Sequence, residues 1–135
     1  DVSTAPAASA KKAVAEEKEA VPQTEIAQGM SLFTNGDYKN AETKFNEVLA
    51  NSPDNADAAH LGGVSTYING NTAKAEQQFD KLLRRGVYVE GSKWYKANIL
   101  LKKGKTAEAK ELLQSLTKTT GVYHDRAVKK LEALQ

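Results

Sequence analysis

Apolar residues recur three and four positions apart along most of the chain, and this period predicts helices rather than strands. The stripe around Phe45 continues through Val48 and Leu49, and the stripe that begins at Phe79 continues through Leu82. Each group therefore falls on one face of a helix. The pattern predicts an all-α chain with helices over about residues 23–35, 38–51, 56–69, 72–85, 91–103, 106–119 and 122–134.

The helical pattern returns at a fixed interval. Gly36, Gly70 and Gly104 stand 34 positions apart. Three columns of apolar residues keep the same interval: Ala41, Ala75 and Ala109; Phe45, Phe79 and Leu113; Val48, Leu82 and Leu116. Four columns in one register over three copies indicate a repeat protein, in which stacked helix pairs share a continuous core.

Each column has a physical reason. Glycine tolerates the positive φ that the turn between two paired helices requires. We expect the alanines to lie where two helices cross closely, and the larger residue four positions later to fill the layer between pairs. Pro53 ends the first pair, because proline cannot continue a helix.

The columns resemble the tetratricopeptide repeat, which has a small residue in its first helix, Ala-x3-Phe in its second, and a closing proline. The first copy, about residues 22–55, carries all three elements: Gly29, Ala41-x3-Phe45 and Pro53. The second and third copies, about residues 56–89 and 90–121, carry two of them: Gly63 with Ala75-x3-Phe79, and Ala97 with Ala109-x3-Leu113.

The second and third copies depart from the family pattern at the closing proline, where they have Val87 and Gly121. Trp94-Tyr95 and the run Ala-Lys-Glu-Leu-Leu at 109–113 are similar to bacterial members of the family. The resemblance covers about three quarters of the chain. It implies a domain over 22–135, a right-handed α-solenoid of three helix pairs in which 122–134 forms a solvating cap.

The first 21 residues break the pattern, because their only larger apolar side chains are Val2, Val14 and Val21. A segment that cannot bury an apolar face predicts a flexible or disordered linker. The chain begins with Asp1 rather than Met, which indicates a processed product or an excised piece. Linkers of this composition are common after a signal peptide or membrane anchor, so we favour the bacterial periplasm or cell envelope over the cytoplasm.

In the family, the first helix of each pair lines a concave surface. The resemblance therefore implies a partner-binding groove with these residues: Ile26, Met30, Phe33, His60, Val64, Tyr67, Trp94, Asn98, and Leu101 or Lys102. Aromatic anchors in such a strip are common hot spots for a bound peptide or helix. The implied function is a non-catalytic scaffold that holds a segment of a partner protein and needs no cofactor.

The groove aromatics have a second interpretation, in which they pack against one another. We favour a core position for Phe33. For Tyr67 and Trp94, a core position and a partly exposed position are equally favoured. The chaperone-binding members of the family grip a terminal carboxylate with Lys and Asn at first-helix positions. Only Asn98 and Lys102, both in the third copy, match that clamp, so the resemblance implies a ligand that presents apolar side chains.

Charge is distributed unevenly. Residues 1–83 carry seven basic and twelve acidic residues, whereas 84–135 carry twelve and five. Six cations make up a candidate basic end: Lys93, Lys96, Lys103, Arg126, Lys129 and Lys130. A basic end attracts an acidic partner, but we favour the alternative of a solvated face. The lysines lack interleaved exposed aromatics, which argues against nucleic acid as the partner.

Catalytic and metal-binding patterns are missing from the sequence. The two histidines, His60 and His124, have no partners at metal-ligand spacing, and the chain has no cysteine. Gly62-Gly63 is not followed by the Gly-Lys-Ser/Thr of a phosphate loop. No apolar run approaches a membrane span. A structural role remains as the second hypothesis, in which the domain self-associates or spaces an envelope-anchored protein.

Overall fold

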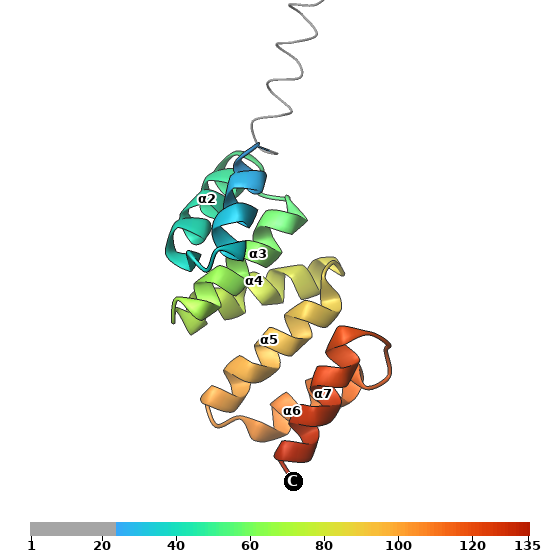
Figure 1. Ribbon diagram of the computed structural model, residues 1–135. Helices are drawn as coiled ribbons and strands as arrows, with labels where there is room; N and C mark the ends of the chain where they lie inside the picture. The colour runs from blue at the N-terminus through green and yellow to red at the C-terminus, as the bar shows by residue number, and fades with distance from the viewer. Residues whose placement is uncertain (1–23) are drawn as a thin grey trace, which may run out of the picture.

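The structure, a computed structural model, describes residues 24–135 and folds them into seven helices without a strand (Figure 1). The first helix covers residues 24–34, and six more follow: α2 (Tyr38–Asn51), α3 (Ala56–Ile68), α4 (Thr72–Arg85), α5 (Val89–Lys102), α6 (Thr106–Leu116) and α7 (Val122–Ala133). From α2 onward, each helix packs on the next. The all-α α-solenoid is confirmed, and the linker proposed for 1–21 lies outside the described residues.

Short polar residues and glycines set the helix ends. The side chains of Asp37, Asn55 and Asn71 accept hydrogen bonds from backbone N–H groups three positions later, and so cap α2, α3 and α4. Every glycine of the 34-residue column has a positive φ, for example +94° at Gly70. The left-handed turn predicted from the glycine column is therefore present between the helices of each pair.

Two helix ends differ from the sequence-based expectation. Helix α5 begins at Val89, two residues early, directly after Tyr88, which has a left-handed φ of 49°. Helix α6 ends at Leu116 instead of about 119, because threonine hydroxyls take over the carbonyls of its last turn. Thr117 Oγ1 donates to the Gln114 carbonyl and Thr119 Oγ1 to the Leu116 carbonyl. Such local bonds compete with continuation of the helix.

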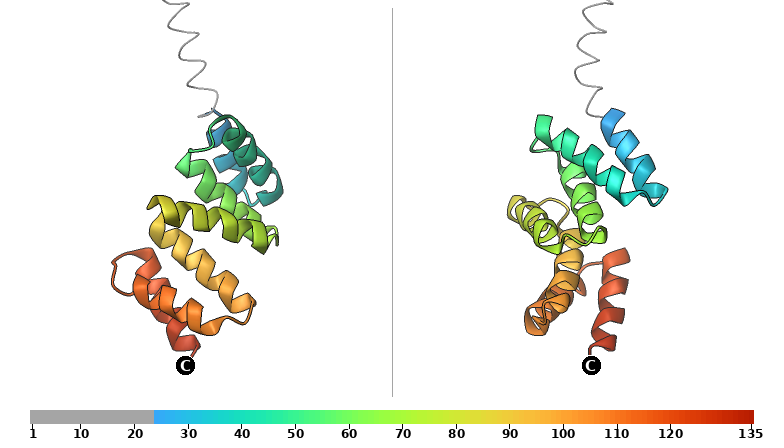
Figure 2. Two further views of the ribbon diagram at one scale, coloured as in Figure 1. Left: turned by 180° about the vertical axis from the view of Figure 1, so that it is seen from behind. Right: turned by 90° about the vertical axis from the view of Figure 1, so that its left-hand side faces the viewer.

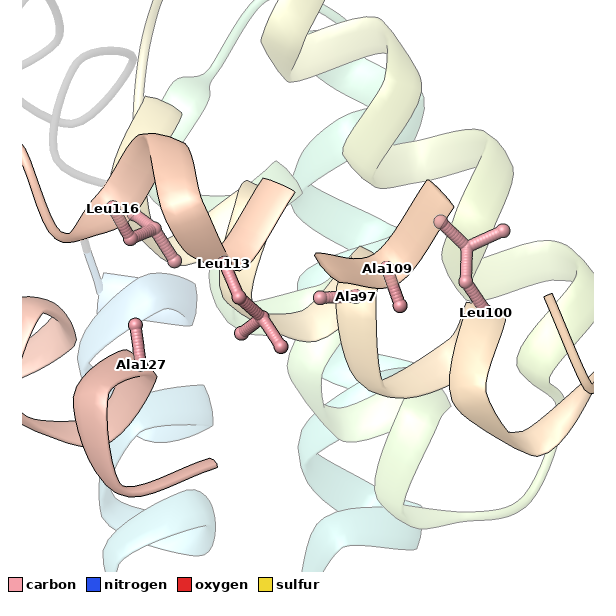
Figure 3. Packing of buried hydrophobic residues seen from close by; sticks show 6 residues of the cluster. All are labelled: Ala97, Leu100, Ala109, Leu113, Leu116 and Ala127. Carbon is pink, nitrogen blue, oxygen red and sulfur yellow. The ribbon is translucent and has the colours of Figure 1, made fainter. Parts of the chain in front are cut away.

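The core consists of three apolar clusters in a row, one for each helix pair. Phe45 is fully buried in the first cluster and Phe79 in the second. The third cluster joins α5, α6 and α7 through the six residues of Figure 3: Ala97, Leu100, Ala109, Leu113, Leu116 and Ala127. Every residue of the predicted alanine and phenylalanine columns is buried, because the repeat places each one at the same helix crossing.

The stack is curved, and its contacts identify the concave side. Helix α3 contacts α5, and α5 contacts α7, whereas within residues 24–135 none of α2, α4 and α6 contacts another of the three. Helices on the inside of a bend approach each other more closely than those outside it. In the right-hand view of Figure 2, the first helix and α7 lie on one side and α4 and α6 on the other. We call the surface formed by the first helix, α3, α5 and α7 the concave face.

Candidate functional site

The N-terminal half of the concave face, formed by the first helix and α3, carries two exposed large apolar side chains. Met30 is 49 % exposed and Ile68 is 45 % exposed. Ile26 and Phe33 are half-buried and pack against the cluster around Phe45. These helices contain no Lys or Arg between residues 24 and 34 or within α3. The two helices of this half therefore offer a partner apolar contact and no Lys or Arg of their own.

Other predicted groove residues contribute less surface. Val64 is only 3 % exposed and belongs to the cluster around Phe79. Leu101 is half-buried against the third cluster. The Asn98 side-chain amide donates to the Trp94 carbonyl within its own helix, at 2.8 Å. The concave face is thus partly filled by its own side chains.

An aromatic cluster lies at the centre of the concave face, where α3 meets α5. The His60 ring stacks on Tyr88 with centroids 4.5 Å apart, and Tyr95 stacks on Phe79 at 5.4 Å. Tyr67 meets Tyr95 edge to face at 5.6 Å. Rings in these arrangements stabilise one another beyond their apolar burial. This cluster joins the second and third repeats and holds Tyr67 at the edge of the exposed surface.

A missing side chain makes room for this cluster. A Cβ atom at Gly91 would lie 2.7 Å from His60 Cε1 and 3.2 Å from the Tyr123 hydroxyl. A larger residue at position 91 would therefore require the His60 ring to shift from its place in the cluster.

His60 is the titratable group of the cluster. Burial lowers its pKa, and the Asp57 carboxylate opposes that shift. Its buried Nδ1 atom has no hydrogen-bond partner within residues 24–135. A second proton on the ring would therefore be poorly accommodated, so the neutral form is the one that the folded protein favours.

The C-terminal half of the concave face, formed by α5 and α7, places cations on aromatic rings. Lys102 Nζ lies 4.6 Å from the centroid of Tyr67, and Lys130 Nζ lies 5.7 Å from that of Trp94. On α7, the Arg126 guanidinium lies 5.4 Å from the ring of Tyr123. Cations at such distances are attracted by the electron-rich ring face. The contacts hold the cations near the surface while leaving N–H groups for a partner.

Beside Trp94 the surface has an open hollow of about 310 Å³. Its lining residues come from α5 and α7: Trp94, Arg126, Lys129, Lys130 and Ala133. A hollow of this size lies at the lower end of the range for small-molecule sites, which are also mostly apolar. One or two side chains of a bound segment would fill it.

The six cations predicted as a basic end do not lie together. Lys96 pairs with Asp80 of α4 at 2.6 Å, and Lys103 pairs with Glu76 of α4 at 2.6 Å. Lys93 Nζ donates to Ser115 Oγ of α6. These three lysines therefore tie α5 to its neighbours. The hydrogen bond and charge of Glu76 also raise the pKa of Lys103.

The other three cations of that set lie on α7 beside the hollow, which sequence reasoning did not connect with Trp94. A signal for this placement exists in the sequence. Gly86-Val87-Tyr88 recurs as Gly121-Val122-Tyr123, which is an offset of 35 rather than 34. With that offset, the groove positions 94 and 98 correspond to 129 and 133, and both of these later residues line the hollow. Helix α7 therefore continues the concave face as well as capping the core.

Among residues 24–135, no three His, Cys, Asp or Glu side chains converge. In that region also, no helix has the length and apolar character needed to cross a membrane.

The architecture defines a class of protein, the helical repeat solenoids, in which stacked helix pairs present an open concave face. Within that class, the tetratricopeptide repeat family matches residues 26–89, the first two helix pairs. This match and the seven helices of residues 24–135 support a tetratricopeptide-type repeat protein. No curated protein matches the chain significantly. Repeats of this family generally mediate protein–protein interactions and serve as non-catalytic scaffolds.

Proposed function

We propose that this chain is a non-catalytic interaction module that holds an extended or helical segment of a partner protein against its concave face. The proposal concerns the surface formed by the first helix, α3, α5 and α7. The proposal rests on one observation, namely that side chains along that face are accessible to a partner. Met30 and Ile68 are about half exposed at one end, and Trp94 borders the hollow at the other.

The exposed apolar residues of the concave face support this function. Met30 and Ile68 remain about half exposed on the first helix and α3, two of the helices that form the concave face. Exposed apolar groups that share one concave surface with an aromatic anchor are typical of sites for a bound peptide or helix.

Site-directed photocrosslinking in cells of the source organism tests the proposal. The photoreactive residue p-benzoylphenylalanine would replace Met30 in one variant and Lys129 in another, so that each half of the concave face carries a probe. Lys74, exposed on α4 of the outer face, is the matched control position. We expect both concave probes to form an adduct with the same partner, and the probe at 74 to form none with it.

Two other results would contradict the proposal. Adducts that form from position 74 but not from positions 30 and 129 would move the site to the outer face. Adducts whose mass is that of two copies of this chain would favour the alternative, a self-associating or spacing domain. Circular dichroism of each variant verifies that the helices are intact.

A further inference from the structure

We propose that the partner segment is acidic where it meets α5 and α7, and that it carries apolar side chains where it meets the first helix and α3. This inference rests on the proposed function and assigns the chemistry of the partner at that same face. It combines two features: cations held on aromatic rings in one half, and exposed apolar side chains on helices without Lys or Arg in the other.

Four cations of α5 and α7 are available to a partner. Among residues 24–135, the ion pairs involve Lys44, Lys96 and Lys103, and none involves Lys102, Arg126, Lys129 or Lys130. These four residues all belong to α5 and α7. Their charge is consequently not neutralised by a carboxylate of the described chain.

Aromatic rings hold three of these cations in place. Lys130 lies over Trp94, and Lys102 lies over Tyr67, so both ammonium groups rest near the concave face instead of extending into solvent. Arg126 reaches Tyr95 closely enough to oppose the rise that burial causes in the pKa of that tyrosine. A positioned cation loses less side-chain entropy when it binds a carboxylate. Positive groups around one hollow also steer an anionic segment during association.

The other half of the concave face, formed by the first helix and α3, has a different character. The first helix contributes Met30 and α3 contributes Ile68, and the charged residues of these two helices are Glu25 and Asp57. An acidic segment that continued across this half would meet no Lys or Arg of these two helices, and Lys102 of α5, which lies over Tyr67, marks the boundary between the two halves. Apolar side chains match this half better, so the complementary segment has an apolar part next to an acidic part.

A protein segment fits these features better than a nucleic acid. Within residues 24–135, the cations of the concave face that form no ion pair all lie on α5 and α7. The phosphates of a bound strand, however, repeat at every nucleotide and require cations along its whole path. The first helix and α3 contribute no Lys or Arg that would neutralise a phosphate. Carboxylates, in contrast, can be concentrated in one part of a peptide.

Selection of random peptides displayed on phage tests the inference with the full chain as bait. In parallel, the selection is repeated on the variant Lys129→Glu/Lys130→Glu. We expect the peptides that the wild-type chain selects to be enriched in Asp and Glu beside Leu, Ile or Phe. A synthetic fluorescein-labelled copy of the most enriched peptide should bind the variant about tenfold more weakly or worse. Binding to the wild-type chain should also weaken as the salt concentration rises.

The matched control is Lys74→Glu/Lys81→Glu, which changes the net charge equally but on the outer helix α4, where both lysines are exposed. This variant should bind the labelled peptide as tightly as the wild-type chain does. Equal weakening by both variants would show an effect of net charge alone and would overturn the assignment to α7.

Three further results would overturn the inference. In the first, the selected peptides show no enrichment in acidic residues. In the second, a labelled oligothymidylate binds the wild-type chain more tightly than the peptide and is lost from Lys129→Glu/Lys130→Glu, which would identify nucleic acid. In the third, the wild-type chain doubles its mass at low salt and that variant does not, which would identify a second copy. If the photocrosslinks from positions 30 and 129 still form, the proposed function survives while this inference fails.

Discussion

The two halves of the concave face stand on the same repeated core but present different surfaces. Phe45 and Phe79 are fully buried four residues after an alanine in successive repeats, and Leu113 takes the same place in the third. Above this shared core, the first helix and α3 leave apolar groups in water, whereas α5 and α7 place cations over rings. Repetition therefore preserves the positions that pack and leaves the concave positions free to diverge.

The aromatic residues show the same division. Phe79 is fully buried and stacks on Tyr95, so its role is structural. Phe33 is half-buried and meets Tyr38 edge to face at 5.2 Å. Trp94 and Tyr67 are also only half-buried, and each has a cation over its ring. An aromatic residue in this solenoid thus belongs to the core or to the surface according to its helix and its position in the repeat.

The largest effect is expected from Phe79→Ala. Removing a fully buried ring leaves a cavity between the two halves, and such changes lower the free energy of unfolding by about 3–5 kcal/mol. Phe33→Ala is the matched comparison, and should cost less because Phe33 is half-buried. Urea denaturation followed by circular dichroism measures both. Equal losses would show that the distinction between core and surface rings does not hold.

A smaller effect is expected from Ala75→Leu. Ala75 is fully buried in the cluster that also contains Phe79, and three more carbon atoms would force the helices apart at a cost of about 1–3 kcal/mol. Ala73→Leu, two residues earlier on α4, adds the same groups at an exposed position. Thermal unfolding should show a lower midpoint for Ala75→Leu alone. An unchanged midpoint would contradict the alanine column as the site of close helix packing.

The smallest effect concerns pH at the boundary between the halves. Because burial lowers the pKa of His60, the unfolded chain binds a proton more readily than the folded one. The contribution of neutral His60 to the stability of the folded chain is therefore fully present above the ordinary histidine pKa of 6.5, and it is lost as the pH falls below that value. We expect the thermal midpoint of the wild-type chain to decline between pH 7.5 and pH 5.5, about one unit on either side of that pKa.

The variant His60→Phe isolates this effect, because a phenyl ring can still stack on Tyr88 but cannot accept a proton. Its midpoint should decline less than that of the wild-type chain over the same pH interval. The change His124→Gln removes the other histidine of the chain and should leave the decline in place. A decline that is unchanged in His60→Phe would assign the pH dependence to other groups.

Several features could be predicted from the sequence because they depend on residues near one another in the chain. The helix periods, the glycine turns and the buried Ala-x3-Phe positions follow from local geometry repeated three times. The closing turn of α6 was missed because its threonine hydroxyls bond to carbonyls of their own helix, which the apolar period does not reveal. The domain boundaries, the bacterial origin and the groove residues remain predictions.

The sequence by itself determined that the chain is a helical repeat protein, since repeated columns leave one way to bury their apolar faces. Only the tertiary structure decided which surface each lysine joins. Lys93 and Lys96 bond to α6 and α4, whereas Lys130 turns towards Trp94. One step along a helix rotates a side chain by about 100°, so its neighbours depend on how the next helix crosses. That crossing is set by packing between repeats, and it separated the structural cations from those of the concave face.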